Sequence, residues 1–284
     1  IDTTDTAGWY VYDHYNSQND YNNLKVDSLR QPFRQADNSH ANGTNPTTIE
    51  KEFASTVPAA CKYFVRHISS SVDEAGKAKM IFAGYGSQAL ADFMIYPAAS
   101  DSRRTFSFDI DAKRVDTHTL TGTGFFVNAG IEGTGTSATV SGYLLFYQFT
   151  SATAGNIYLI PMTKVNAMNF QTSNVTSLYS QAIAKDTFNL GASKKARIDV
   201  DLQATSLTVQ QRNYASDGIT FEETKTLFGG KAVTMNRTGF NGFGPMAAYG
   251  SHGCSSLSSF EFSDLEMNYE ANAFDALKNV QYSE

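Results

Sequence analysis

Several features that mark other protein classes are scarce or missing in this sequence. It has two cysteines, one tryptophan and only 18% charged residues in 284 positions. Cys61 and Cys254 stand far apart, and neither belongs to a CxxC or another zinc-binding spacing, which argues against a structural zinc site. The sequence leaves open whether they form a disulfide in an oxidising compartment or remain two buried thiols.

Signals for membranes and nucleic acids are also missing. No apolar run approaches the ~20 residues needed to span a bilayer, and no signal peptide is recognisable. The formal net charge is -6, and the basic residues are dispersed rather than gathered into the stripe that nucleic-acid binding requires. We therefore expect no membrane insertion and no nucleic-acid partner.

Aromatic residues are abundant, with 20 Phe and 15 Tyr, and they are set among many Ser, Thr, Gly and Asn. This balance favours short strands joined by turns over a helical bundle. The length suits one large all-β domain or two smaller domains. The abrupt start at "IDTTDTAGWYVYDHY" and the end at "FDALKNVQYSE" are typical of a segment cut from a longer multidomain chain.

The first 79 residues carry the weakest pattern. Residues 1–48 are polar and predict a short strand or extended arm followed by a long irregular loop. Pro58 interrupts any helix that begins shortly before it. The apolar residues that follow recur at helical spacing, with a strand over "KYFVRHI" as the competing interpretation: Cys61, Phe64, Val65 and Ile68.

From residue 80 onward the pattern is that of strands and turns. In "RTFSFDIDAKRV" the apolar residues Phe106, Phe108 and Ile110 share one face. "ARIDVDLQATSLTVQQRN" predicts a hairpin that turns near residues 204–205. The parity of apolar residues switches in "SSFEFSDLEMNYE", which predicts a bulge or bend near residues 263–264. Further strands are expected in "KMIFAGYG", "ADFMIYP", "GTGFFVNAGI", "GYLLFYQF", "NIYLIPMTKV" and "GFGPMAAYGS".

A series of strands without intervening helices predicts an all-β protein, an antiparallel two-sheet β-sandwich. The order "FSFDID", "GTGFFVNAGI", "SGYLLFYQF", "ARIDVDLQATSLTVQ" and "GFGPMAAYGSHGCSSLSSFEFSDLEMNY" resembles the concanavalin A-like jelly roll of lectins and glucanases. More closely, it resembles a module of large, adhesin-like cell-surface proteins of Gram-positive bacteria. The resemblance covers about residues 80–270.

From the pattern and the resemblance we expect three parts. An irregular N-terminal extension (1–79) packs on the sandwich, the jelly-roll core spans 80–270, and a linker (271–284) leads to a following domain. The resemblance implies an extracellular, monomeric module at the cell surface or cell wall, whose partner is a glycan or a host or cell-surface protein. It does not imply the ligand, because the jelly roll hosts many functions.

The stretch "YGSHGCSS" (249–256) places a histidine and a cysteine close together. Cysteine catalysis needs a thiolate within hydrogen-bond reach of a base that a third group orients, and the local signatures of cysteine proteases are absent. Gly250, Gly253 and the flanking serines instead predict a loop between the last two strands, with Cys254 packed as a small apolar side chain. We expect no catalytic residue here.

A glycoside hydrolase would need two acids about 5–5.5 Å or roughly 6.5–9.5 Å apart. Glucanases of the resembled fold commonly carry E-x-D-x-x-E on one strand, but in the nearest phrase here Glu261 and Asp264 have opposite parity. Two other pairs lie opposite apolar positions and are expected to be solvent-facing strand charges: Asp109 with Asp111, and Asp199 with Asp201. The sequence thus favours a protein that is not an enzyme.

Legume-type lectins, of the resembled fold, carry a D-G-x-x-F-F-like phrase that helps to build a calcium-supported sugar site. The matching stretch here begins at Thr121, so a threonine stands in place of the acid. Calcium takes about six to eight oxygen ligands, and no D-x-D-x-D-G loop supplies them. We expect no cofactor, with calcium in a surface loop left open at no defined position.

Aromatic residues near the N-terminus give the best generic binding signal, because flat apolar faces with polar tips suit stacking on sugars or protein contacts. The competing interpretation is that they pin the N-terminal arm to a sheet. Together with loop residues at one rim of the sandwich, the candidate ligand-binding residues are Trp9, Tyr12, His14, Asn128, Tyr249 and His252. The first hypothesis is a non-catalytic module for adhesion or glycan recognition. The others are a carbohydrate-active enzyme with acids from separate strands and a purely structural spacer.

Overall fold

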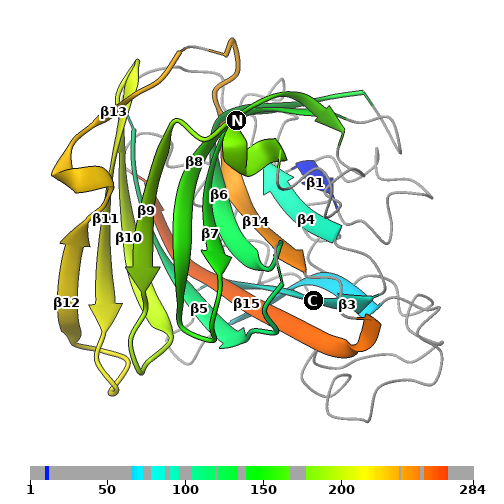
Figure 1. Cartoon of the computed structure of the whole chain (residues 1–284), viewed down its shortest axis with the longest axis vertical. Coiled ribbons are helices and arrows are strands. Elements are labelled where there is room, and N and C mark those ends of the chain that lie inside the picture. Colours follow the sequence, from blue (N-terminus) through cyan, green and yellow to red (C-terminus); the bar gives the residue numbers. More distant parts are fainter. Residues whose placement is uncertain are drawn as a thin grey trace.

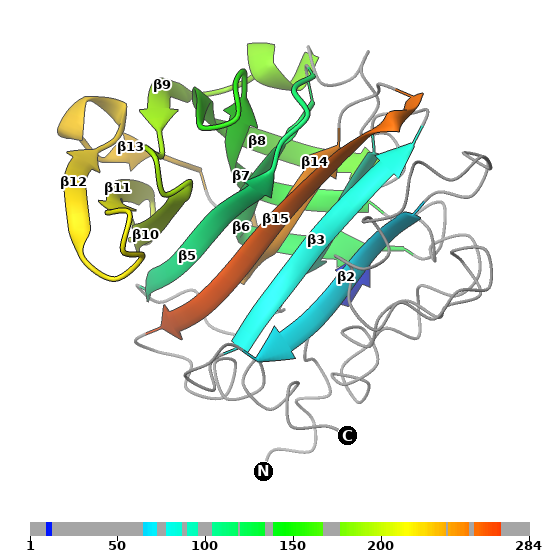
Figure 2. The same cartoon turned by 90° about the horizontal axis from the view of Figure 1, so that it is seen from below.

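The strands of this chain pack as two antiparallel sheets, shown in two views in Figures 1 and 2. The computed structural model describes residues 10–12, 65–72, 78–86, 90–95, 104–118, 120–133, 139–166, 177–236, 238–249 and 253–267. Figure 2 shows β3, β5 and β15 of one sheet in front of β6, β7 and β8 of the other. Among the described residues, none forms a helix with the length and hydropathy that crossing a bilayer would take.

The two sheets contain strands from all along the chain. The seven-stranded sheet has the spatial order β1 (Tyr10–Tyr12), β4 (Leu90–Ile95), β14 (Gly242–Tyr249), β6 (Gly122–Glu132), β7 (Thr139–Phe149), β8 (Ala154–Asn166) and β9 (Ala184–Asn189). The eight-stranded sheet has the order β12 (Phe221–Thr226), β11 (Ser206–Tyr214), β10 (Lys195–Leu202), β5 (Arg104–Arg114), β15 (Gly253–Met267), β3 (Ala78–Gly86) and β2 (Val65–Val72), with β13 (Val233–Thr234) beside β11. The expected all-β fold, an antiparallel two-sheet β-sandwich, is confirmed.

The main core lies between the sheets and is built from the alternating residues that the sequence indicated. Phe106, Phe108 and Ile110 of β5 face it together with Phe125 of β6 and Phe262 of β15. The rings of Phe108 and Phe125 stack with centroids 4.6 Å apart, and those of Phe108 and Phe262 with centroids 4.8 Å apart. Each aromatic pair of this kind adds about 0.5–1.5 kcal/mol beyond its buried area.

A second apolar cluster covers the other face of the seven-stranded sheet. It includes Phe126, Leu144 and Ile160, which have the opposite parity to the main-core residues of their strands. The side chains of Leu178 and Tyr179, from a single helical turn at residues 177–180, pack into this cluster. Because both faces of the sheet are buried, β6 and β7 read as nearly continuous apolar runs rather than alternating ones.

The N-terminal segment contributes strands to both sheets. β1 pairs with β4 and β2 pairs with β3. The helical interpretation is therefore wrong for residues 65–72, where the competing strand interpretation is confirmed, because the β-branched and alternating residues of "VRHISSSV" find a partner in β3. The division of the chain at residues 79 and 270 stays a prediction.

The bulge expected near residues 263–264 is confirmed. The register of β15 against β5 shifts between Ser263 and Glu266, and Asp264 adopts a φ of 52°. The hairpin of β10 and β11 is also found, with Leu202 paired to Leu207 at its turn. Three strands were not anticipated from the sequence: β9, β12 and β13.

Candidate ligand-binding site

The two sheets come together at one side of the sandwich, where β9 is the last strand of its sheet and β12 is the last strand of the other (Figure 1). An edge strand exposes backbone groups that need partners. Here the partners of β9 are side chains of the opposite sheet. Lys225 Nζ donates to the Thr187 carbonyl at 2.9 Å, and the amides of Gln211 and Asn213 both donate to the Asn189 carbonyl, at 3.2 and 2.6 Å.

A pocket of about 150 Å³ lies at this junction. Its lining consists of Thr187, Phe188, Asn189, Gln211, Asn213, Glu223 and Lys225. The volume exceeds the roughly 30 Å³ share of one liquid water several times, yet it is below the ~300–1,000 Å³ of a typical small-molecule site. The pocket therefore has room for a few waters or for a small polar ligand group.

The floor of the pocket is polar because the core-facing side chains of β11 change from apolar to polar along the strand. Leu207 and Val209 are apolar and belong to the main core. Gln211 and Asn213 continue the same parity and are 3% and 4% exposed. Their cross-strand partners in β12 are Lys225 and Glu223, respectively.

The carboxamide of Gln211 is only partly satisfied. Its Nε2 donates to the Asn189 carbonyl and, at 2.8 Å, to Asn213 Oδ1. Both are acceptors, so the reverse amide orientation would set oxygen against oxygen, and this orientation is the chemically consistent one. Gln211 Oε1 is buried and accepts no hydrogen bond from any residue that the structure describes. A buried acceptor left unpaired costs about 1–3 kcal/mol.

Lys225 is held in place by Asp186. Its Nζ lies 3.1 Å from Asp186 Oδ1, and Asp186 also accepts the backbone N–H groups of Thr187 at 2.7 Å and Phe228 at 2.8 Å. Desolvation raises the pKa of Asp186, but the N–H donors and Lys225 outweigh it, so the net pKa lies below its usual value. Asp186 therefore stays ionised and matches the charge of Lys225.

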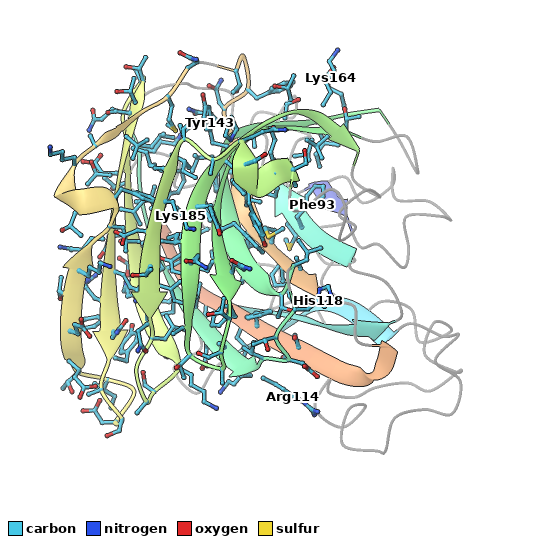
Figure 3. The ribbon with its side chains drawn as sticks, in the orientation of Figure 1. Phe93, Arg114, His118, Tyr143, Lys164 and Lys185 are labelled. Carbon is cyan, nitrogen blue, oxygen red and sulfur yellow. The ribbon has the colours of Figure 1, made fainter. Side chains whose placement is uncertain are left out.

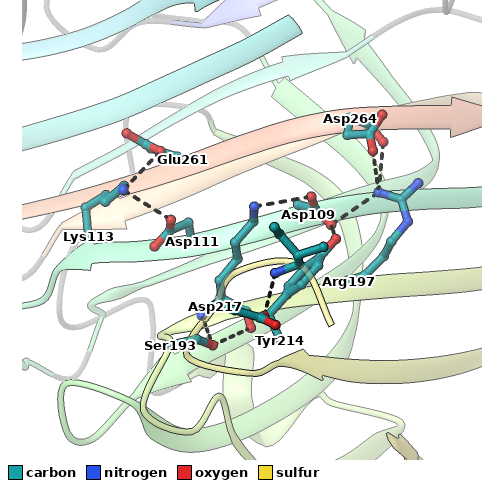
Figure 4. Close-up of polar contacts among 11 residues, drawn as sticks. Asp109, Asp111, Lys113, Ser193, Arg197, Tyr214, Asp217, Glu261 and Asp264 are labelled. Carbon is teal, nitrogen blue, oxygen red and sulfur yellow. Dashed lines mark hydrogen bonds and ion pairs between the residues drawn. The ribbon is translucent and has the colours of Figure 1, made fainter. Parts of the chain in front are cut away.

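The opposite, outer face of the eight-stranded sheet carries a network of charges (Figure 4). Arg197 Nη1 donates to Asp109 Oδ1 at 3.2 Å and to the carbonyl and Oδ2 of Asp264 at 3.1 and 3.4 Å. The Tyr214 hydroxyl donates to Asp109 Oδ1 at 2.7 Å, and Lys195 Nζ lies 3.7 Å from Asp109 Oδ2. These contacts hold the β15 bulge at Asp264 against β5 and β10.

The expectation that Asp109 is a solvent-facing strand charge is wrong. The residue is on the outer face, as its parity predicts, but it is only 5% exposed because its cationic and phenolic neighbours cover it. The side chains of Asp111 and Asp199 are 17% and 27% exposed and pair with Lys113 and Arg212. The carboxylate of Asp109 is thus committed to a structural network.

Thr121, which stands in place of the acid in the compared lectin phrase, uses its hydroxyl for a hydrogen bond within the protein. Thr121 is fully buried, and its hydroxyl donates to the Asp116 carbonyl at 2.8 Å. In the part of the chain that the structure describes, no group of three or more His, Cys, Asp and Glu residues is arranged to hold a metal ion. The residues around Thr121 therefore do not fit a calcium site.

The structure describes Asn128 best among the six candidate binding residues. It lies at a bulge of β6, where the register against β7 shifts between Val127 and Gly130. Its φ of 46° is in the left-handed region that Asn tolerates, and its carbonyl accepts the Thr238 hydroxyl at 2.6 Å. It is not among the residues that line the pocket, and a role in binding stays a prediction.

The other five candidates are described in part or not at all. Tyr12 of β1 pairs through its backbone with Phe93 of β4, and Tyr249, at the end of β14, pairs with Leu90 of β4. The structure does not describe the side chain of either tyrosine. Trp9, His14 and His252 lie outside the described residues. Cys254, expected in a loop, has its backbone in β15, which begins at Gly253.

Sequence reasoning missed the pocket because β9 and β12 carry weak patterns. β12 is exposed or half-buried throughout. In β9 the inward Asp186 and Phe188 alternate with exposed residues. One of these exposed residues is Lys185, labelled in Figure 3, whose ammonium lies 5.4 Å from the ring centre of Tyr158. The available signal was the polar pair Gln211 and Asn213 at core-facing positions of an otherwise apolar strand.

Comparisons with known proteins give distant structural likenesses. No protein-family model and no curated protein matches the chain. Among solved structures, the metal-free exoplasmic/lumenal domain of VIP36 matches with 12% identity and a TM-score of 0.42, over 71% of this chain and 83% of that one. The metal-free carbohydrate recognition domain of Emp46p matches with 10% identity and a TM-score of 0.42, over 82% and 96%.

A third matched structure carries the name GH43B. The GH43B protein of the Bacteroides ovatus xyloglucan locus matches with 8% identity and a TM-score of 0.37, over 67% of this chain and 32% of that one. Likenesses at these levels of identity and TM-score assign neither a family nor a ligand to this chain.

Proposed function

We propose that this protein is a non-catalytic binding module that recognises a glycan at the pocket between β9, β11 and β12. The observation that carries the proposal is the buried Gln211 carboxamide, whose Oε1 lacks a donor among the described residues while the residue lines an open polar pocket. A sugar hydroxyl is a donor of the right kind. Gln211 Oε1 is closed to solvent, so the hydroxyl would relieve this acceptor after a rotation of the carboxamide toward the pocket, and carboxamides with a few fixed polar groups are suited to orienting such a ligand.

Among the described residues that line the pocket there is one carboxylate, which favours recognition over hydrolysis. Glycoside hydrolysis needs two carboxyl groups that face one substrate. Glu223 lines the pocket, whereas Asp186 pairs with the pocket residue Lys225 and also accepts two backbone N–H groups. We place the module outside the cell, within a longer surface protein that acts in adhesion.

The test is a glycan array probed with the purified chain, with calcium and with a chelator in parallel arms. Hits are then measured with Gln211→Met, which keeps the length of the side chain but removes its hydrogen bonds, and with Glu222→Gln as a matched surface control. Circular dichroism and thermal unfolding establish that each variant is folded. We expect binding that is independent of calcium, lost in folded Gln211→Met and kept in Glu222→Gln.

Two results would count against the proposal. An array without hits in both arms removes glycan recognition and leaves protein adhesion as the alternative. Hits that survive Gln211→Met place the glycan elsewhere, and the rim candidates Trp9, Tyr12, His14, Asn128, Tyr249 and His252 become the next residues to substitute.

A structural spacer is the second candidate function. The hydrogen bonds from Lys225, Gln211 and Asn213 to the β9 carbonyls close the open side of the sandwich. This structural role alone would account for the polar residues at these positions. In that case water fills the pocket. Gln211→Met would then lower the melting temperature, while neither the variant nor the wild type would bind glycans or host matrix proteins.

A further inference from the structure

The charges around the pocket do not balance. Lys225 and Asp186 form an ion pair with Nζ and Oδ1 3.1 Å apart, and Lys225 also donates to the Thr187 carbonyl. Glu223 lines the same pocket and is exposed. Among the described residues, no cation or hydrogen-bond donor reaches its side chain. The pocket therefore presents one uncompensated negative charge at its entrance.

We infer that the pocket selects sugars by charge, with cationic amino sugars bound most tightly, neutral sugars next, and uronic or other acidic sugars least. This inference rests on the proposed glycan function and names the class of glycan that the pocket takes. Gln211 Oε1 supplies the buried acceptor for a hydroxyl, and Glu223 supplies the charge that the rest of the ligand meets.

The arrangement in the sheet lets the two groups act on one ligand. Glu223 pairs across the strands with Asn213, and Asn213 Oδ1 is bonded to Gln211 Nε2. The buried carboxamide and the exposed carboxylate are thus two neighbouring positions on one face of the β11–β12 pair. A pocket of about 150 Å³ holds one sugar residue at most, so this residue must satisfy both groups.

The ion pair limits the competing attraction of an acidic sugar to Lys225. Lys225 already donates to Asp186 and to the Thr187 carbonyl, so an incoming carboxylate would meet a lysine whose charge Asp186 already balances. In water, a unit charge about 4 Å from Glu223 changes affinity roughly five-fold. We therefore expect about a five-fold step between cationic and neutral sugars and a similar step between neutral and acidic sugars.

The experiment compares ligands that share one pyranose ring and differ in charge. The methyl glycosides of glucosamine, glucose and glucuronic acid, and the corresponding galactose series, are titrated by NMR against the whole chain. The titrations are run at pH 6, where the amine is protonated, and at low and high salt. Glu223→Gln is the test variant. Glu222→Gln removes the same charge from the neighbouring β12 position, which does not line the pocket, and is the matched control.

We expect the order cationic, neutral, acidic in the wild type and in Glu222→Gln. The order should collapse to within about two-fold in Glu223→Gln and weaken in high salt, because exposed charges are screened. Neutral sugars should bind wild type and Glu222→Gln alike. Their binding reports on the proposed function independently of the charge order.

The outcomes separate the two claims. Binding of neutral sugars with no charge order, or with acidic sugars preferred, overturns the charge selectivity and leaves glycan recognition standing. An order that persists in Glu223→Gln also overturns it, because another group would then set the selectivity. If no sugar of either series binds, both claims fail.

Discussion

Arg197 offers a sharp test of how the buried charges stabilise this fold. Its side chain is 8% exposed and contacts three carboxylates, those of Asp109, Asp264 and Glu266. It also donates to the Asp264 carbonyl in the β15 bulge. The perturbation is Arg197→Met, which preserves much of the side-chain volume but removes the charge and every one of these hydrogen bonds.

The magnitude follows from what remains around each carboxylate. Asp109, with a side chain 7% exposed, would retain the Tyr214 hydroxyl at 2.7 Å and the Lys195 ammonium at 3.7 Å. The side chains of Asp264 and Glu266 are 18% and 63% exposed, so water can replace part of what they lose. Removing one partner of a buried pair costs about 3–5 kcal/mol, and the remaining contacts place this case near 3 kcal/mol.

The control is a second arginine on the same face. Arg212 contacts Asp199 through two hydrogen bonds, 2.7 and 3.0 Å long, but the two side chains are 30% and 27% exposed. An ion pair open to solvent contributes about 0–1 kcal/mol. Arg197→Met should therefore cost about 2 kcal/mol more than Arg212→Met, a difference of roughly 4–8 °C in melting temperature for a domain of this size.

Urea unfolding monitored by circular dichroism measures both costs. A cycle with Asp109→Asn and the double variant isolates the coupling between Arg197 and Asp109, which we expect to be about 1–3 kcal/mol. Equal losses for Arg197→Met and Arg212→Met would refute the reasoning, because they would show that burial of the network adds nothing to its strength.

Three further results are expected. Tyr147→Phe should raise stability by about 1 kcal/mol in urea unfolding, because the buried Tyr147 hydroxyl has no hydrogen-bond partner among the described residues, and a loss would reveal a partner. Burial, followed by nearby Asp186 or Asp109, raises the pKa of Tyr147 and Tyr214 in the folded chain. The two neutral tyrosine hydroxyls therefore give their full stabilisation below about pH 10, which is the pKa of tyrosine in the unfolded chain. This stabilisation is lost as the pH rises further. Melting temperatures should fall above pH 10, and less steeply in Tyr147→Phe. Gly155→Ala should cost about 3 kcal/mol by thermal unfolding, because a Cβ there would clash with a backbone carbonyl, and a cost below about 1 kcal/mol would contradict this packing.

The architecture could be predicted where apolar residues follow a strict period. β5, β10 and β15 bury alternate residues against one core, so their parity appears directly in the sequence. The parity change at Asp264 even located a bulge. β6 and β7 were recognised as strands, but burial on both of their faces was not, since a continuous apolar run does not say what covers the second face.

The site could not be predicted in the same way, because it depends on contacts between strands that are distant in sequence. Gln211 and Asn213 gain their meaning only when the free carbonyls of β9 lie beside them. The burial of Asp109 likewise requires Arg197 and Tyr214 from other strands. Parity assigns a side chain to a face of the sheet, but the neighbours on that face decide whether it meets water.

The positions of β14 and β15 have a consequence for how the chain acquires its structure during synthesis. β14 lies between β4 and β6 in one sheet, and β15 lies between β3 and β5 in the other, although both come after every other strand in the sequence. Until residues 242–267 leave the ribosome, each sheet consists of two halves with open inner edges. Such edges invite pairing with other chains, and contacts between distant segments form slowly. The last two strands therefore complete both sheets, and we expect the unfinished chain to be most prone to aggregation before they pair.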